Sequence, residues 1–160
     1  MKPLRSLVPL ILIVVANWAQ AQEKICPLDV EREKRIELEA TQSLFDGEPV
    51  RIPKAKTNAK TKDFLGIWLP GRADKPAIVL AHGPGRNVGV AAISQTSLAL
   101  NELGYATLAL QMPVQQKDCE SAEAYPQTFS DAFARIDAAA AWLQSRGQRE
   151  LVLFAHWVGN

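Results

Sequence analysis

Short apolar runs alternate with longer stretches of helical periodicity in the second half of the chain. The runs at 77–81, 105–110 and 151–154 are almost wholly apolar, which is typical of parallel strands covered on both faces. Between them lie two segments whose apolar residues recur every three or four positions. Strand, helix, strand, helix, strand in this order predicts an α/β fold with a doubly wound, mostly parallel sheet and right-handed crossovers.

The spacing of apolar residues defines the two helices. The first stripe holds Ser97 among the apolar side chains Val90, Ile93, Leu100 and Leu103, and the helix is expected to end at Gly104, a favoured C-cap residue. The second helix should bury the stripe formed by Phe129, Phe133, Ile136, Ala140 and Leu143.

The first half of the chain is less regular. Residues 64–69 predict a strand, and residues 50–52 predict a shorter one. Charged and apolar residues alternate over 31–39, which leaves a short edge strand and a frayed helix as alternatives. The lysine-rich segment 54–62 predicts a solvated loop, because it has no aromatic residues on which nucleobases could stack.

The N-terminus has the three parts of a secretory signal peptide. Basic residues precede the apolar run 7–16, and Ala19-Gln20-Ala21 is a small-x-small cleavage site. The apolar run is shorter than the ~20 residues of a spanning helix, so we expect no membrane span after cleavage. This predicts a signal peptide over 1–21 and an exported protein of Gram-negative type, periplasmic or secreted. The mature part divides into an N-terminal extension with short strands (22–62) and an α/β domain (63–160).

Composition narrows the function classes. The 160 residues include 18 basic and 17 acidic ones, so the formal charge of +1 gives no electrostatic reason to expect a nucleic-acid partner. Export places Cys26 and Cys119 in an oxidising compartment, where a disulfide and two unpaired thiols are the alternatives. Neither cysteine has metal-ligand spacing, and the chain has two histidines, so we expect no metal and no cofactor.

The last ten residues have the layout of a nucleophile elbow. The apolar run 151–154 leads directly into Ala155-His156-Trp157-Val158-Gly159-Asn160. The elbow motif G-x-S-x-G holds a serine on a sharp turn between a strand and a helix. Trp157 stands at the serine position, and an indole has no nucleophilic oxygen or sulfur.

Four stretches together resemble the α/β-hydrolase superfamily, and more closely a family of secreted bacterial α/β-hydrolase-like proteins of unknown function. They are Ile78–Gly85, Gly104–Pro113, Ala134–Ala139 and the elbow-like end, so the resemblance covers about 64–160. It implies a three-layer sheet with helices on both faces and a site at the carboxyl ends of the strands. The sequence ends shortly after the elbow, so we expect a domain truncated after the elbow strand.

The resemblance also implies roles for individual residues. His82 and Gly83 would open the loop that helps to form an oxyanion hole, with Gly85 as a further backbone donor. His156, Trp157 and Val158 would form the elbow. Pro84 follows His-Gly, where many of these enzymes use a backbone N–H that proline lacks. The acid and histidine of a triad would follow the nucleophile in this fold.

These features predict an exported α/β-hydrolase-like domain that is catalytically degenerate and acts by binding. The first alternative is the N-terminal part of a hydrolase acting on carboxylic esters or related acyl bonds. The second is an interaction protein of the cell envelope. The corresponding partners are a small-molecule ester, or a protein that covers an open sheet face.

Overall fold

The computed structural model describes residues 24–44, 46–54, 63–119, 121 and 123–156. The expected signal peptide, most of the lysine-rich segment, and the elbow residues Trp157 and Val158 lie outside these residues. No helix in the described part of the chain is both long enough and apolar enough to cross a membrane.

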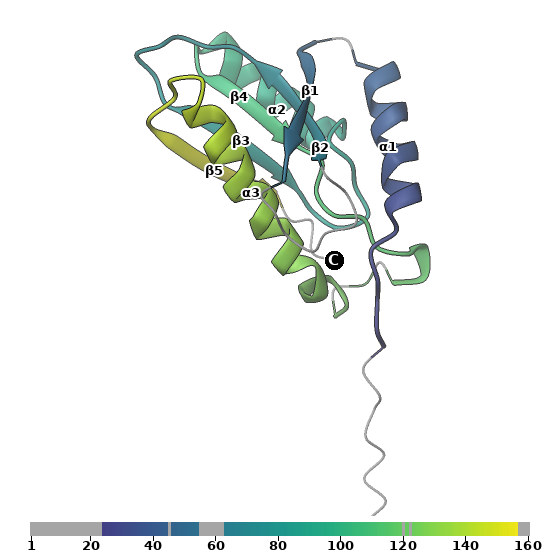
Figure 1. The fold of residues 1–160 in the computed structure, drawn as a ribbon. Helices are drawn as coiled ribbons and strands as arrows, with labels where there is room; N and C mark the ends of the chain where they lie inside the picture. Colours follow the sequence, from purple (N-terminus) through teal and green to yellow (C-terminus); the bar gives the residue numbers. More distant parts are fainter. Residues whose placement is uncertain (1–23, 45, 55–62, 120, 122, 157–160) are drawn as a thin grey trace, which may run out of the picture.

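The protein has a mixed α/β fold built on one five-stranded sheet, with strand order β1-β2-β4-β3-β5 (Figure 1). β2 runs antiparallel to both of its neighbours, and β3 is parallel to β4 and β5. Four of the strands therefore point the same way. All the segments expected to be strands form this sheet, as β1 (Glu48–Pro53), β2 (Asp63–Leu69), β3 (Ala77–His82), β4 (Ala106–Leu110) and β5 (Leu151–His156).

Three α-helices in the described residues surround the sheet: α1 (Val30–Gln42), α2 (Ala91–Glu102) and α3 (Phe129–Gln144). Figure 1 shows α2 and α3 on opposite faces, with α1 beside the sheet. Two short 3₁₀ turns, η1 (Lys117–Cys119) and η2 (Tyr125–Thr128), lie between β4 and α3. Because β1 pairs with β2 along its length, the segment expected to be an extension contributes a strand to the same sheet.

Local signals explain where the first two helices begin and end. Of the two alternatives for 31–39, the structure has the helix. Asp29 caps it by accepting the backbone N–H of Arg32 at 2.9 Å. Gly104, at φ +88°, turns the chain from α2 into β4, which confirms its predicted role as the helix stop.

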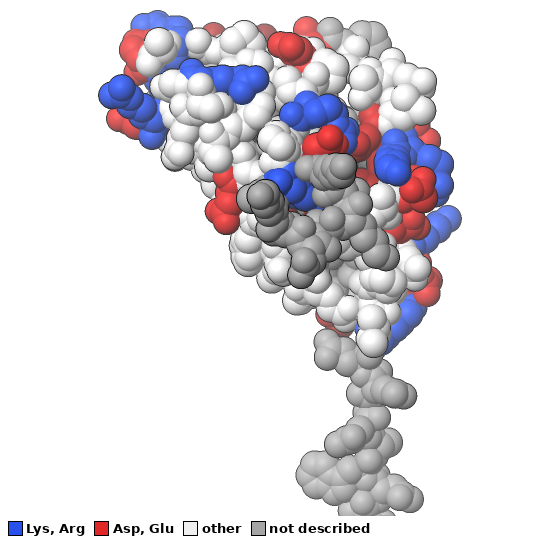
Figure 2. All heavy atoms as spheres, in the orientation of Figure 1, with Lys and Arg blue, Asp and Glu red and all other residues white. Residues whose placement is uncertain are grey.

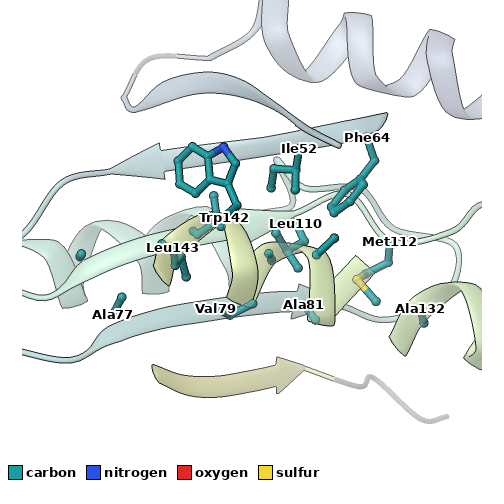
Figure 3. Close-up of a cluster of buried hydrophobic side chains, with 14 residues drawn as sticks. Ile52, Phe64, Ala77, Val79, Ala81, Leu110, Met112, Ala132, Trp142 and Leu143 are labelled. Carbon is teal, nitrogen blue, oxygen red and sulfur yellow. The ribbon is translucent and has the colours of Figure 1, made fainter. Parts of the chain in front are cut away.

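The largest of three hydrophobic clusters in the described residues lies between the sheet and α3. Figure 3 shows Phe64, Val79 and Leu110 of the sheet on the same side as Trp142 and Leu143 of α3. The second cluster lies on the opposite face, under α2 and the end of α1, and includes Leu80, Ile93 and Ala40. Burial on both faces explains why β3 and β4 are almost continuously apolar.

The buried face of α3 differs from the predicted stripe. Phe129 is 41% exposed and Phe133 is 60% exposed, whereas Leu143 is buried as expected. The helix is rotated so that a row containing an arginine faces inward, made of Ala132, Arg135, Ala138, Ala139, Trp142 and Leu143. Hydrophobic periodicity misplaces this face because it counts the arginine as a surface residue.

Strand β5 is apolar but poorly covered. Among the described strands it pairs only with β3. Leu153 is 51% exposed on the α3 side of the sheet, and Val152 and Phe154 are exposed on the other side. Both faces and the outer edge of this strand are therefore open within the described chain.

A buried arginine joins α1, α3 and the sheet. Arg135 is 1% exposed, and its guanidinium makes a two-pronged contact with Glu33 of α1, with N–O distances of 2.9 Å. It also donates to Asp131 on its own helix, which in turn binds Lys54 after β1. Buried charges are tolerated when they are paired and hydrogen-bonded in this way.

The same network completes the sheet where two strands separate. The backbone ladder between β2 and β4 ends with the N–H of Gln111 bonded to the C=O of Leu65. Beyond it, Glu37 accepts the N–H of Leu65 at 2.9 Å, and Arg135 donates to the C=O of Gln111 at 2.7 Å. Side chains from α1 and α3 thus satisfy the N–H of Leu65 and the C=O of Gln111, which no longer pair with each other where β2 and β4 separate.

Replacing Arg135 with Met should therefore destabilise the protein strongly. The variant leaves the carboxylate of Glu33 buried without a partner, and we expect a loss of about 3–5 kcal/mol in the free energy of unfolding. Urea denaturation followed by circular dichroism measures it. Arg149→Met, at an exposed position, is the matched control and should change stability by less than about 0.5 kcal/mol.

A double variant tests the cause of that loss. Removing the orphaned charge by adding Glu33→Gln to Arg135→Met should recover part of the stability, so the two effects should not add. Strict additivity, or a loss no larger than that of the Arg149 control, would show that the buried charge pair does not hold these elements together.

Candidate functional site

The candidate site lies at the carboxyl end of the parallel strands, where two loops leave the sheet. The loop after β3 runs from Gly83 to Val90, and the loop after β4 runs from Gln111 to Gln116. His82 and His156, the last residues of β3 and β5, are register partners. The structure therefore brings the expected oxyanion loop and the start of the expected elbow side by side.

His82 uses both of its ring nitrogens on the backbone. Nε2 accepts the N–H of Met112 at 3.0 Å, and Nδ1 lies 2.8 Å from the C=O of Gly83. Since the Met112 nitrogen is a donor, Nε2 must be the unprotonated nitrogen, and Nδ1 carries the proton that it donates to Gly83. No lone pair of this imidazole is left to accept a proton from a nucleophile.

Burial keeps His82 neutral. The side chain is 4% exposed, and desolvation lowers its pKa to about 4, with the nearby charge of Arg135 acting in the same direction. A neutral imidazole preserves the acceptor nitrogen that Met112 requires. The electrostatics and the hydrogen bonds therefore support the same positioning role, in which His82 ties the β3 loop to the β4 loop.

Gln111 makes the reciprocal tie. Its side chain is completely buried. Its Oε1 accepts the N–H of Val88 in the β3 loop at 3.1 Å, while its Nε2 donates to the C=O of Met112 at 2.9 Å. The buried side chains of His82 and Gln111 therefore link the two loops directly to each other by hydrogen bonds to the backbone. Arg135 of α3 also donates to the backbone carbonyl of Gln111.

The cavity enclosed here is small. About 50 Å³ is available between the two loops, α1 and η2, with Arg32 and Ile36 on the α1 side and Tyr125 on the η2 side. Binding pockets for drug-sized ligands are about 300–1,000 Å³. The space between the two loops is therefore the size for a few water molecules, and too small for such a ligand.

A disulfide fixes the chain segment that closes this end of the sheet. Cys26 and Cys119 are bonded, which is the first of the two alternatives that the sequence leaves open. Next to the bond, the N–H of Asp29 donates to the C=O of Val114 at 2.8 Å, and Leu28 forms an isolated antiparallel bridge with Gln115. These contacts hold α1 beside the β4 loop.

The other expected site residues have mixed outcomes. Gly83 is buried, Gly85 is exposed at φ +65°, and Pro84 lies between them at the rim of the small cavity. Trp157 and Val158 lie outside the described residues, so the expected elbow stays a prediction. No group of three metal-binding side chains occurs in the described ranges.

Sequence reasoning missed the polar residues that organise this end of the sheet: Glu33, Glu37, Gln111 and Arg135. Three of them carry a formal charge, and charged residues are normally exposed. One signal is the i, i+4 spacing of Glu33 and Glu37 on α1, which places both carboxylates on one helix face. Gln111 gives no such signal, because its role depends on where β4 ends.

Comparison with known proteins does not assign this chain to a family, since no family model, curated protein or solved structure matches it.

The depressed pKa of His82 predicts a specific dependence of stability on pH. Between its ordinary pKa of 6.5 and its folded pKa of about 4, the unfolded chain binds a proton that the folded protein excludes. Stability should thus fall as the pH drops through this window, with His82 contributing a loss of up to about 3 kcal/mol. Urea unfolding at a series of pH values measures it.

His82→Gln is the matched variant, because its amide does not titrate. At each pH, the free energy of unfolding of the variant is subtracted from that of the wild type. The difference isolates the contribution of the histidine, because the carboxylates titrate in both proteins. A difference that stays constant between pH 7 and pH 4 would contradict the assignment. In the wild type, the NMR signals of the His82 ring should show a neutral, Nδ1-protonated imidazole down to about pH 5.

Removing the disulfide should weaken the protein. The bond links residues separated by 93 positions, and loss of a native disulfide typically costs about 2–5 kcal/mol. The Cys26→Ser/Cys119→Ser variant should show that loss in urea. Dithiothreitol should shift the wild-type midpoint and leave the variant unchanged, and equal midpoints for oxidised and reduced wild type would contradict the prediction.

Proposed function

We propose that this chain is an exported, catalytically degenerate α/β-hydrolase-like domain that acts by binding. The observation that carries the proposal is the state of His82. Both of its nitrogens are bonded to the backbone and burial lowers its pKa to about 4, so it is a positioning residue and not a general base. Pro84 removes a backbone donor from the same loop, and Trp157 supplies no nucleophile at the expected elbow position.

The architecture supports the hydrolase-like part of the proposal. Helices lie on both faces of a mostly parallel sheet, as the resemblance implies. The register pairing of His82 with His156 is where a hydrolase of this kind would place its oxyanion loop and nucleophile turn. Under this proposal, the chemical groups at that position differ from those of a hydrolase, while the sheet that holds them is similar.

The disulfide supports the exported part of the proposal. Buried disulfides persist in oxidising compartments such as the periplasm, which agrees with the signal-like segment at 1–21.

The distribution of surface charge bears on the kind of partner. Figure 2 shows that acidic and basic side chains are interspersed on the face in view. This distribution offers no continuous basic surface there for nucleic acid.

An esterase assay tests the proposal. The exported product, incubated with p-nitrophenyl esters of short acyl chains, should release nitrophenol no faster than buffer does. His82→Gln should be indistinguishable from the wild type in this assay. Turnover by the wild type above the rate in buffer, whether or not it disappears in His82→Gln, would overturn the degenerate function.

The second candidate is that these residues are the N-terminal part of an active acyl hydrolase, favoured by the same His82–His156 register. Within the described chain, the hydroxyls of α2 offer no activated nucleophile, since Thr96 bonds to the carbonyl of Ala92 and Ser97 bonds to Thr107. Labelling of the exported product by a fluorophosphonate probe would support this candidate, and absence of labelling would rule out an activated serine.

A further inference from the structure

A second and larger cavity lies on the α2 face of the sheet and reaches the loop after β3 at Val88 and Gly89. Its floor is formed by Ile67 of β2 and Ala109 of β4, and its walls by Leu98 of α2, Val88 and the end of α1 at Ala40. Its volume is about 380 Å³. This falls in the range of small-molecule pockets, about 300–1,000 Å³, and is well above the ~150 Å³ of a cavity that accepts benzene.

The interior of this cavity offers no charged partner. Ser97, which is 4% exposed, and the fully buried Thr107 bond to each other at 2.7 Å, so the hydroxyl of Ser97 is already paired. Ser94 donates to the carbonyl of Val90. A charged group brought onto this floor would lose its hydration without gaining an ion pair.

The exposed rim sets the polarity of an occupant. Asp46 lines the cavity at the end of α1 and is exposed, which favours a ligand with a hydrogen-bond donor over one with an anionic group. Glu39 and Arg86 line a neighbouring hollow, where they carry opposite charges. The chemistry therefore combines an apolar body held under α2 with a donor at the mouth.

We propose that this cavity binds a small, uncharged, mainly apolar molecule carrying a hydrogen-bond donor. The proposal does not rest on the degenerate function, because neither His82 nor Gln111 lines the cavity, and the lining residue Val88 takes part in the tie only through its backbone N–H. Binding here would be equally compatible with an active or an inactive carboxyl end of the sheet.

Gly89 provides a way to block the cavity without straining the backbone. It lines the cavity, and a Cβ added there would lie 3.9 Å from the Cβ of Ala40 on the opposite wall. Both that contact and the 3.4 Å approach to Asn87 are ordinary van der Waals distances, and Gly89 is not among the glycines with positive φ. Gly89→Leu should therefore fill the opening with the fold intact.

The test uses two dyes that differ by one charged group. N-phenyl-1-naphthylamine is uncharged and carries an N–H donor, and 1-anilinonaphthalene-8-sulfonate is the same fluorophore with a sulfonate. The full exported protein should bind the neutral dye saturably at one site and the sulfonate at least about tenfold more weakly. Equal or tighter binding of the sulfonate would overturn the proposed ligand class.

The variants locate the dye. Gly89→Leu should weaken binding of the neutral dye by about tenfold or more, whereas Gln95→Leu, which adds the same side chain on the exposed side of α2, should leave it unchanged. If Gly89→Leu retains full binding, the dye sits on other apolar surface such as β5, and the proposal is wrong. Absence of any saturable binding to the wild type overturns it too.

A second filling variant guards against a misfolded first one. Ala40→Leu introduces the side chain from the α1 wall, where the buried Ala40 borders the open cavity and leucine is a good helix former. Far-UV circular dichroism should show wild-type secondary structure in both variants. Loss of dye binding in both folded variants supports the site, and retention of binding in a folded Ala40→Leu protein counts against it.

Discussion

The buried guanidinium of Arg135 is the contact on which the arrangement of the other elements depends. It reaches from α3 past the end of β4 to Glu33 on α1, so one side chain joins two helices and the sheet. Glu33 is also buried, whereas the side chain of Asp131 is 15% exposed, and hydrogen bonds are electrostatically stronger in such an environment than in water. Because the charge must stay paired, the positions of α1, α3 and the end of β4 are coupled.

The polar layer at the carboxyl end of the sheet follows from that coupling. Arg135 donates to the backbone carbonyl of Gln111, and the side chain of Gln111 accepts a backbone N–H from the loop after β3. His82, at the end of β3, accepts a backbone N–H from the loop after β4. In the described residues, no buried side-chain polar atom lacks a partner. A site whose polar groups are all paired internally has little left with which to polarise a substrate, although the same pairing makes it a rigid support.

The parts that sequence could predict are those in which one physical effect dominates. The apolar runs of β3 and β4 predict strands because both faces are buried, and Gly104 predicts a helix end because it accepts positive φ. The face of α3 was predicted wrongly because a buried ion pair outweighs the hydrophobic stripe, and Phe133 is exposed as a result. The ties made by His82 and Gln111 depend on where two distant strands end, and no local pattern contains that information.

The disulfide divides the fold into two topological parts. Joining Cys26 to Cys119 encloses α1, β1, β2, β3, α2 and β4 in one covalent ring, while α3 and β5 lie outside it. The ring holds four adjacent strands and keeps its elements near one another even when unfolded. The segment after Cys119 adds α3, which packs on the largest hydrophobic cluster, and the edge strand β5, whose faces are open. Opening of the segment after Cys119 would leave the ring connected, but it would first have to separate the buried Arg135 from Glu33 and from the carbonyl of Gln111.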